Sequence, residues 1–254
     1  MLWEERINSY TKATKFPRSL FWSEDGRVVG TWIMGNDYRV KSGLYGGYPA
    51  GYLRRVAALF PDKRCVLHLF SGMVDLAVLP GDTVDLRPET APTFLDDAQS
   101  LLNVPLERYD LVLADPPYSV EDAEHYGPTM VKRNLVMRAL QRVSEGTHVV
   151  WLDQVLPMYR KDAFSLEAVV GMVKSTNHRF RVISIFRRLG PPYEPRLQTP
   201  SPVHPESVGE AAELSDVTGG QAAGGTCGVV GLADQLAHGD QSDPRPTPLE
   251  AVAE

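Results

Sequence analysis

Residues 109–118 read Tyr-Asp-Leu-Val-Leu-Ala-Asp-Pro-Pro-Tyr, an apolar run that stops at two consecutive prolines. Proline fixes φ and lacks a backbone donor, so a strand must end there. The break leaves the Asp115 carboxylate, the Pro116 carbonyl and the Tyr118 ring at the carboxyl end of a predicted strand. Ligands bind at that edge of open α/β sheets, and an acceptor pair beside an aromatic ring suits a planar base with an exocyclic amino group. The simpler interpretation is a strand followed by a Pro-rich turn.

The chain up to about residue 190 predicts alternating strands and helices, an α/β fold. A segment from about 128 to 144 carries apolar residues on one face, which predicts an amphipathic helix that ends at Gly146. Residues 166–173 and 179–186 predict two strands joined as a hairpin. Buried strands separated by crossovers are typical of a doubly wound, mostly parallel sheet, to which the hairpin would add an antiparallel edge. The other expected strands are 64–70, 83–87, 93–97, 110–114 and 147–152.

Composition places the chain among ordinary globular proteins. Its 254 residues suffice for one or two domains, and 43% apolar with 23% charged residues is typical of that class. Cys65 and Cys227 stand in unrelated contexts, so they predict neither a disulfide framework nor a metal site. The sequence shows no signal-peptide pattern and no stretch long enough to cross a membrane. We therefore expect a cytoplasmic protein with no membrane partner.

Charge divides the chain into a mildly basic body and an acidic tail. Residues 201–254 hold one basic and nine acidic residues, a net charge of −8, which leaves 25 basic and 23 acidic residues, a net charge of +2, for residues 1–200. Beyond about Pro191 the chain is rich in Pro, Gly, Ala, Ser and Asp and has no aromatic residue after Tyr193. A segment of this composition cannot offset its ordering entropy, so we expect residues 191–254 to be a disordered acidic tail.

The amino-terminal segment, residues 1–44, has two possible interpretations. It holds three of the four tryptophans, a predicted strand at 27–34, and a basic and aromatic stretch at 12–18. Because tryptophans are mostly buried, we favour an extension that packs on the core over a nucleic-acid contact.

Two groups of basic residues further along the chain could either contact phosphates or form a solvated face, and we favour the solvated face. They are Lys132, Arg133, Arg138 and Arg142 on the expected helix, and Arg179, Arg181, Arg187 and Arg188 near the last strand.

Candidate ligand-binding residues follow three successive strands that precede Asp115. Gly72 comes after the first, where a glycine permits close approach of a ligand to the backbone. Asp85 ends the second, thirteen residues later, where a carboxylate commonly accepts ribose hydroxyls in nucleoside-binding folds. Asp97 and Ala98 follow the third, where a carboxylate or the next backbone amide could meet an adenine edge. Each acid taken alone would be a solvated loop residue, but together they predict a nucleoside site.

With these residues the sequence resembles the S-adenosylmethionine-dependent amino-methyltransferases, particularly the DNA adenine-N6 methyltransferases. The resemblance covers about residues 45–190 and implies a Rossmann-like methyltransferase fold that binds S-adenosyl-L-methionine. It also implies that Tyr45 and Pro49, from the segment Tyr-Gly-Gly-Tyr-Pro, help to enclose the methionine moiety. The matching elements are Phe70-Ser71-Gly72, Asp85, Asp97-Ala98 and Asp115-Pro116-Pro117-Tyr118.

The resemblance further implies how a base would be methylated. Asp115 and the Pro116 carbonyl would accept hydrogen bonds from the target amino group, and Tyr118 would stack on a flipped base. His125 and Tyr126, in the loop that follows, would contact the base or a phosphate. The implied substrate is adenine N6 in DNA. Guanine N2 or adenine N6 in RNA is the alternative, because the tetrapeptide does not separate them.

The sequence departs from the family pattern, and its thin glycine loop motivates a further alternative, a non-catalytic methyltransferase-like protein that binds nucleic acid or another partner. The loop at Gly72 has one glycine where the family usually has two or three, and His68 stands where an acidic residue is common. Only residues 71–82 separate the first two strands, a minimal length for a parallel crossover. The first helix of the fold is therefore expected to be short or replaced by a loop.

Overall fold

The apolar run at 109–118 forms the strand that its sequence predicts. Strand β6 (Leu111–Ala114) has all four side chains buried and ends directly before Asp115. The computed structural model describes residues 1–16, 19–35, 47–117, 130–174 and 180–190, all of which belong to one compact unit, Met1–Gln198. The expected acidic tail, 191–254, lies outside the described residues.

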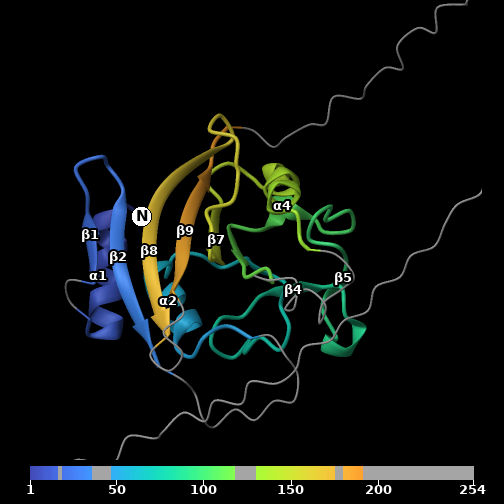
Figure 1. Ribbon diagram of the computed structural model, residues 1–254, viewed down its shortest axis with the longest axis horizontal. Helices are drawn as coiled ribbons and strands as arrows, with labels where there is room; N and C mark the ends of the chain where they lie inside the picture. Colours follow the sequence, from blue (N-terminus) through green and yellow to red (C-terminus); the bar gives the residue numbers. More distant parts are fainter. Residues whose placement is uncertain (17–18, 36–46, 118–129, 175–179, 191–254) are drawn as a thin grey trace, which may run out of the picture. The chain divides into compact units, whose positions relative to one another are not determined.

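The described residues form a mixed α/β fold built on one nine-stranded sheet (Figure 1). The strand order is β1-β2-β8-β9-β7-β6-β3-β4-β5, and five of the eight neighbouring pairs are parallel. The five parallel strands that the sequence predicts are confirmed within a few residues. The strands are β1 (Leu20–Trp22), β2 (Val28–Met34), β3 (Val66–Leu69), β4 (Asp82–Asp85), β5 (Phe94–Leu95), β6, β7 (His148–Asp153), β8 (Phe164–Lys174) and β9 (Phe180–Arg188).

The expected hairpin forms, but the prediction that it supplies the edge of the sheet is wrong. Strands β8 and β9 pair antiparallel, and β9 lies between β8 and β7. Strand β2 continues the sheet beyond β8 in parallel register, from Val28 opposite Ala168 to Met34 opposite Lys174. Strand β1 then forms the edge. The reason is that β2 buries alternate residues, Trp32 completely, and so needs a strand partner as well as a helix above it.

Helices cover both faces of the sheet. Helices α1 (Trp3–Thr14) and α2 (Tyr52–Leu59) pack over one core, which includes Trp32, Leu113 and Ile183. Helix α4 (Arg133–Ala139) lies over the other, which includes Leu69 and Trp151. Short 3-10 helices occur at η1 (Pro88–Thr90), η2 (Leu106–Arg108) and η3 (Leu140–Arg142).

Helix α4 is shorter than the predicted helix at 128–144. Lys132 has an extended backbone, and its N–H donates to Oε1 of Gln99 at 2.9 Å, so the helix begins only at Arg133. Beyond Ala139 the chain tightens into η3, and Gly146 adopts a left-handed φ of 80°. The predicted apolar face is confirmed where it is helical, because Val136, Ala139 and Leu140 are buried. Residues 128 and 129 lie outside the described part of the chain.

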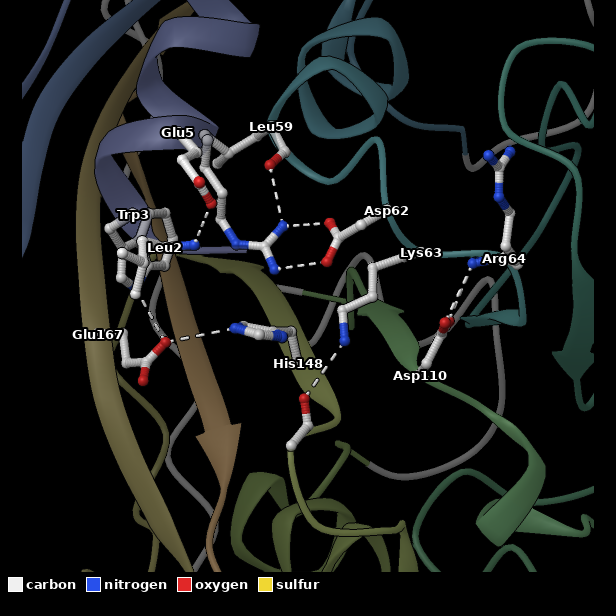
Figure 2. Close-up of polar contacts among 12 residues, drawn as sticks. Leu2, Trp3, Glu5, Leu59, Asp62, Lys63, Arg64, Asp110, His148 and Glu167 are labelled. Carbon is white, nitrogen blue, oxygen red and sulfur yellow. Dashed lines mark hydrogen bonds and ion pairs between the residues drawn. The ribbon is translucent and has the colours of Figure 1, made fainter.

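A polar cluster ties helix α1 to the amino-terminal edge of the sheet (Figure 2). We call it the amino-edge cluster. Arg6 donates from both terminal nitrogens to Asp62, at 2.5 and 2.9 Å, and the Trp3 indole donates to Glu167 at 2.9 Å. Glu167 also contacts His148 at 3.3 Å. The cluster consists of Trp3, Arg6, Asp62, His148, Glu167 and Arg187, whose Nε also donates to Glu167. These contacts fix the start of the chain against strands more than a hundred residues away.

Candidate nucleoside site at the carboxyl edge of the sheet

The pairing register brings the predicted strand-end residues to one level of the sheet. The last residues that pair among β3, β4, β6 and β7 form a continuous row, because Leu69 pairs with Val84 and Ala114, and Ala114 pairs with Trp151. The next residue on each strand therefore stands in the next row. That row contains Phe70, Asp85, Asp115 and Leu152, together with Leu95, which pairs with Asp85. Strands β3, β4, β6 and β7 are mutually parallel, so this row is the carboxyl edge.

The turn after β3 is fastened to the end of β4. Phe70 and Gly72 both adopt left-handed φ values, 55° and 49°. The Ser71 N–H donates to the Val84 carbonyl at 3.1 Å, and the Gly72 N–H donates to Oδ2 of Asp85 at 2.8 Å. The Ser71 hydroxyl is buried and has no hydrogen-bond partner among the described residues. The structure therefore joins the predicted Gly72 and Asp85 directly.

Asp85 is buried at the centre of this contact. Its Oδ1 accepts from the backbone N–H of Arg87 at 2.9 Å and from the Arg87 Nε at 3.2 Å. Its Oδ2 accepts from Gly72, and a carboxylate oxygen can accept two hydrogen bonds. The guanidinium and two backbone donors supply the hydrogen bonds that this buried carboxylate needs, because burying an isolated charge would be costly. A ribose hydroxyl can still donate to Oδ2.

The predicted pair Asp97 and Ala98 lies beside Asp85, and its carboxylate acts locally. The Asp96 N–H donates to the Asp85 carbonyl at 3.3 Å, and the Asp97 N–H donates to Oδ1 of Asp96 at 2.8 Å. Oδ1 of Asp97 accepts from the Gln99 N–H at 2.9 Å and so stabilises the turn that follows. The Ala98 side chain is buried in the core beneath α4. The Asp97 N–H and carboxylate are therefore both engaged within the turn, and at this strand end the Ala98 N–H is better placed than either to meet a base.

Asp115 is half-buried, and Pro116 and Pro117 behind it are buried. Three of the other predicted site residues, Tyr118, His125 and Tyr126, follow directly in the chain but lie outside the described residues. Tyr45 also lies outside them, whereas Pro49 is buried and its carbonyl accepts from the Tyr52 N–H at 2.9 Å, just before α2.

Two tyrosines that the sequence analysis did not single out stand beside Asp115. The rings of Tyr48 and Tyr52 stack with centroids 5.1 Å apart, and both hydroxyls are buried without a hydrogen-bond partner among the described residues. Burial raises the pKa of both phenols well above the usual value, and the charge of Asp115 adds to the rise. The signal available in the sequence was two tyrosines four residues apart, but Tyr48 precedes α2, so helical spacing does not explain why the rings stack.

His68, which replaces a common acidic residue, is a buried side chain of β3. Its Nε2 lies 3.0 Å from the Leu79 carbonyl, and its ring centroid lies 6.0 Å from that of Tyr48. Burial lowers the pKa of His68 to about 4, although the hydrogen bond to Leu79 opposes the change. The neutral imidazole therefore helps to hold the turn at 70–81, in which no helix occurs, as the sequence predicts.

Asp153 is a further strand-end acid that the sequence analysis missed. It ends β7, and its side chain is completely buried. Arg133, the first residue of α4, donates to it from Nε at 2.5 Å and from Nη2 at 3.1 Å, and the Trp151 indole donates at 3.1 Å. The rule that selected Asp85 and Asp115 would also have found it. This ion pair attaches α4 to the sheet beside the candidate site.

The Arg133–Asp153 ion pair shows that the basic residues on and around α4 do not all form a solvated face, as the sequence had predicted. Arg133 binds Asp153, and Arg142 donates from Nη2 to the Leu101 carbonyl. Arg187 and Arg188 near the last strand likewise make internal contacts, with Glu167 and with the Gln141 carbonyl. Lys132 and Arg138 remain exposed, as expected.

No protein-family model matches the sequence, and no curated protein matches it at a significant level. Within the described ranges, no group of three or more acidic, histidine or cysteine residues is arranged to hold a metal ion. No helix among the same residues is long and apolar enough to cross a membrane.

Proposed function

We propose that this protein transfers a methyl group from S-adenosylmethionine to the exocyclic amino nitrogen of a nucleic-acid base, specifically adenine N6 in DNA. The observation that carries the proposal is the meeting of Gly72, Asp85 and Asp115 at one edge of the sheet. These are the residues on which the resemblance to amino-methyltransferases rests. Their arrangement supports a nucleoside site next to an acceptor for an amino group.

We further propose that the sheet is a Rossmann-like methyltransferase fold. The order β5-β4-β3-β6-β7 corresponds to 3-2-1-4-5 in a doubly wound sheet, and the order reverses between β3 and β6. Ligands of such sheets bind in the crevice at the reversal, outside the carboxyl ends of the strands. Gly72 and Asp115 follow β3 and β6, on the two sides of that point.

The residues at the end of β3 and β4 fit a nucleoside-containing cofactor. Asp85 has acceptor capacity for a ribose hydroxyl, the buried Ser71 hydroxyl lacks a partner among the described residues, and Gly72 has no side chain to obstruct a ligand. S-adenosylmethionine would supply an already activated methyl group at its sulfonium. These three residues would hold the cofactor, and the Asp97–Ala98 backbone would meet the adenine edge.

Asp115 and the Pro116 carbonyl would orient the target amine. A carboxylate and a carbonyl oxygen accept the two N–H bonds of an exocyclic amino group, which leaves the nitrogen lone pair directed away from them. Positioning of this kind supplies much of the rate acceleration when the transferred group is already activated. The buried prolines limit the backbone freedom of Asp115, so the acceptors stay in place.

Two other functions are alternatives to the proposed one. An RNA base methyltransferase would use the same acceptors on guanine N2 or adenine N6. A non-catalytic nucleic-acid or partner-binding protein is favoured by the turn at 70–81, because no helix there offers its N-terminal donors to a ligand. The intact Asp115-Pro116-Pro117 element opposes that function.

Calorimetric titration with S-adenosylmethionine tests the cofactor assignment. We expect saturable binding by the wild-type protein, at least tenfold weaker binding by Asp85→Asn, and nearly unchanged binding by Asp115→Ala. Exposed Glu107, in η2 before the amino end of β6 and so at the opposite end of that strand from Asp115, gives the matched control Glu107→Gln. If the folded wild-type protein shows no saturable binding, both enzyme hypotheses are rejected and the non-catalytic function is favoured.

A further inference from the structure

Two buried phenol hydroxyls next to the Asp115 carboxylate are unexplained by the proposed function. Tyr52 is completely buried, Tyr48 is half-buried, and neither hydroxyl oxygen has a hydrogen-bond partner among the described residues. Buried polar side-chain atoms nearly always have a partner, so each exception requires a reason. Their apolar surroundings explain how the rings pack but not why phenylalanine does not occupy these positions.

Strand geometry places Asp115 on the same face of the sheet as the two tyrosines. Leu111 and Leu113 of β6 belong to the core beneath α1 and α2, which also contains Tyr52. Successive side chains of a strand alternate, so Asp115, two residues after Leu113, continues that face. On neighbouring β3, His68 pairs with Leu113 and lies 6.0 Å from the Tyr48 ring, between centroids. The tyrosine pair therefore lies over the end of β6.

The effect of the Asp115 charge on the two phenols agrees with the placement of the tyrosine pair over the end of β6. The charge of Asp115 is among the causes that raise the pKa of both phenols, after burial. Other ionisable groups at this end of the sheet include Asp85, which is paired with Arg87, His68, which burial keeps neutral, and Asp153, which is paired with Arg133. In the described part of the chain, Trp32 Nε1 and the Ser71 hydroxyl are also buried without a hydrogen-bond partner, but the two phenols are the groups whose pKa the charge of Asp115 raises.

We propose that Tyr48 and Tyr52 are positioning residues for Asp115, and that their hydroxyls donate hydrogen bonds to its carboxylate when a base amine is bound. The inference rests on the proposed function, because it assigns Asp115 the role of hydrogen-bond acceptor for the amine. Hydrogen bonds to an ionised carboxylate favour the ionised form, which is the form that accepts hydrogen bonds from an amine. The stacked rings, held against Trp32 and His68, would fix the direction of both donors.

The test measures the pKa of the Asp115 carboxyl by ¹³C NMR on protein labelled at aspartate Cγ, with Asp115→Asn to assign the resonance. The protein is saturated with an unmethylated adenine oligodeoxynucleotide and S-adenosylhomocysteine, which has no methyl group to transfer. In the double variant Tyr48→Phe, Tyr52→Phe, we expect the pKa of Asp115 to rise by at least one unit. Tyr109→Phe is the matched control, because Tyr109 is also a buried tyrosine and donates to a different carboxylate, Asp82, at 2.7 Å. It should leave the Asp115 pKa unchanged.

A methyl-transfer assay on the same proteins gives the second measurement. We expect the double variant to lose at least tenfold in kcat with little change in KM for S-adenosylmethionine, and the acidic limb of its pH profile to move up with the Asp115 pKa. An unchanged Asp115 pKa in a folded double variant overturns the inference, whatever the activity. Absence of transfer by the wild-type protein, together with a raised Asp115 pKa in the variant, instead rejects the proposed function and leaves the tyrosine–carboxylate pairing standing.

Discussion

Replacing Glu167 by glutamine removes a negative charge that three other residues of the amino-edge cluster contact. The Glu167 carboxylate accepts from the Trp3 indole at 2.9 Å and contacts His148 Nε2 at 3.3 Å (Figure 2). It also accepts from Arg187. Burial alone would raise the pKa of Glu167, but these hydrogen bonds outweigh it and lower the pKa from 4.5 to about 2. The ionised form is therefore bound more tightly in the folded state than in the unfolded chain.

The size of the effect follows from linkage between ionisation and folding. One pKa unit corresponds to about 1.4 kcal/mol, so the lowering sets a ceiling of about 3 kcal/mol. The Glu167 side chain retains 15% of its exposure, and solvent screening reduces the expected loss in Glu167→Gln to about 2 kcal/mol. For a chain of this size, such a loss lowers Tm by roughly 4–8 °C.

The assay is urea unfolding of wild-type protein and Glu167→Gln at pH 7 and at pH 3. Because the folded-state pKa is the lower one, the stabilisation is complete above about pH 4.5 and is lost as the pH falls towards 2. The difference in unfolding free energy should therefore be about 2 kcal/mol at pH 7 and clearly smaller at pH 3. Exposed Glu107→Gln should change neither value by more than about 0.5 kcal/mol. A loss below 0.5 kcal/mol at pH 7, or one that does not vary with pH, would refute the reasoning.

Three further predictions concern the frame around the candidate site. Arg133→Met leaves the fully buried Asp153 without its ion-pair partner and should lower the free energy of unfolding, measured by chemical denaturation, by about 3–5 kcal/mol. If the double variant Arg133→Met, Asp153→Asn recovers stability, the loss comes from the unpaired charge and not from lost packing. Gly81→Ala would place a Cβ 2.5 Å from a backbone oxygen of β3 and should cost about 1–3 kcal/mol, whereas Gly35→Ala, where a Cβ meets nothing within 4 Å, should be nearly neutral. His68 should titrate near pH 4 by NMR, and a value above 6 would contradict its burial.

Local pattern was sufficient to predict the central strands. The apolar run before Asp115-Pro116 specifies where β6 begins and ends, because two prolines stop a strand whatever surrounds them. Apolar runs also located β3 and β7, although no proline ends those strands. Residues that follow parallel strands meet at one edge of the sheet, which is why Gly72 and Asp85 could be expected at the same edge, whereas their direct contact could not.

The remaining features depend on contacts between distant parts of the chain. Strand β2 pairs with β8, about 140 residues later, and no local signal identifies that partner. The start of α4 is set by a hydrogen bond from Lys132 to Gln99, which helical periodicity cannot reveal. The environment of Tyr48 and Tyr52 likewise depends on where β6 ends in space, and Tyr48 precedes α2, so helical spacing does not predict that the two rings meet.

Incubation with isotopically labelled S-adenosylmethionine, on unmethylated DNA and on RNA in parallel, tests the central claim most directly. Nucleoside mass spectrometry then identifies the methylated base, with Asp115→Ala as the matched inactive variant. We predict labelled N6-methyladenine in the DNA, absent when Asp115 is alanine. Label in RNA alone would replace the proposed substrate by the alternative one. Label in neither nucleic acid, or transfer undiminished in Asp115→Ala, would contradict the account.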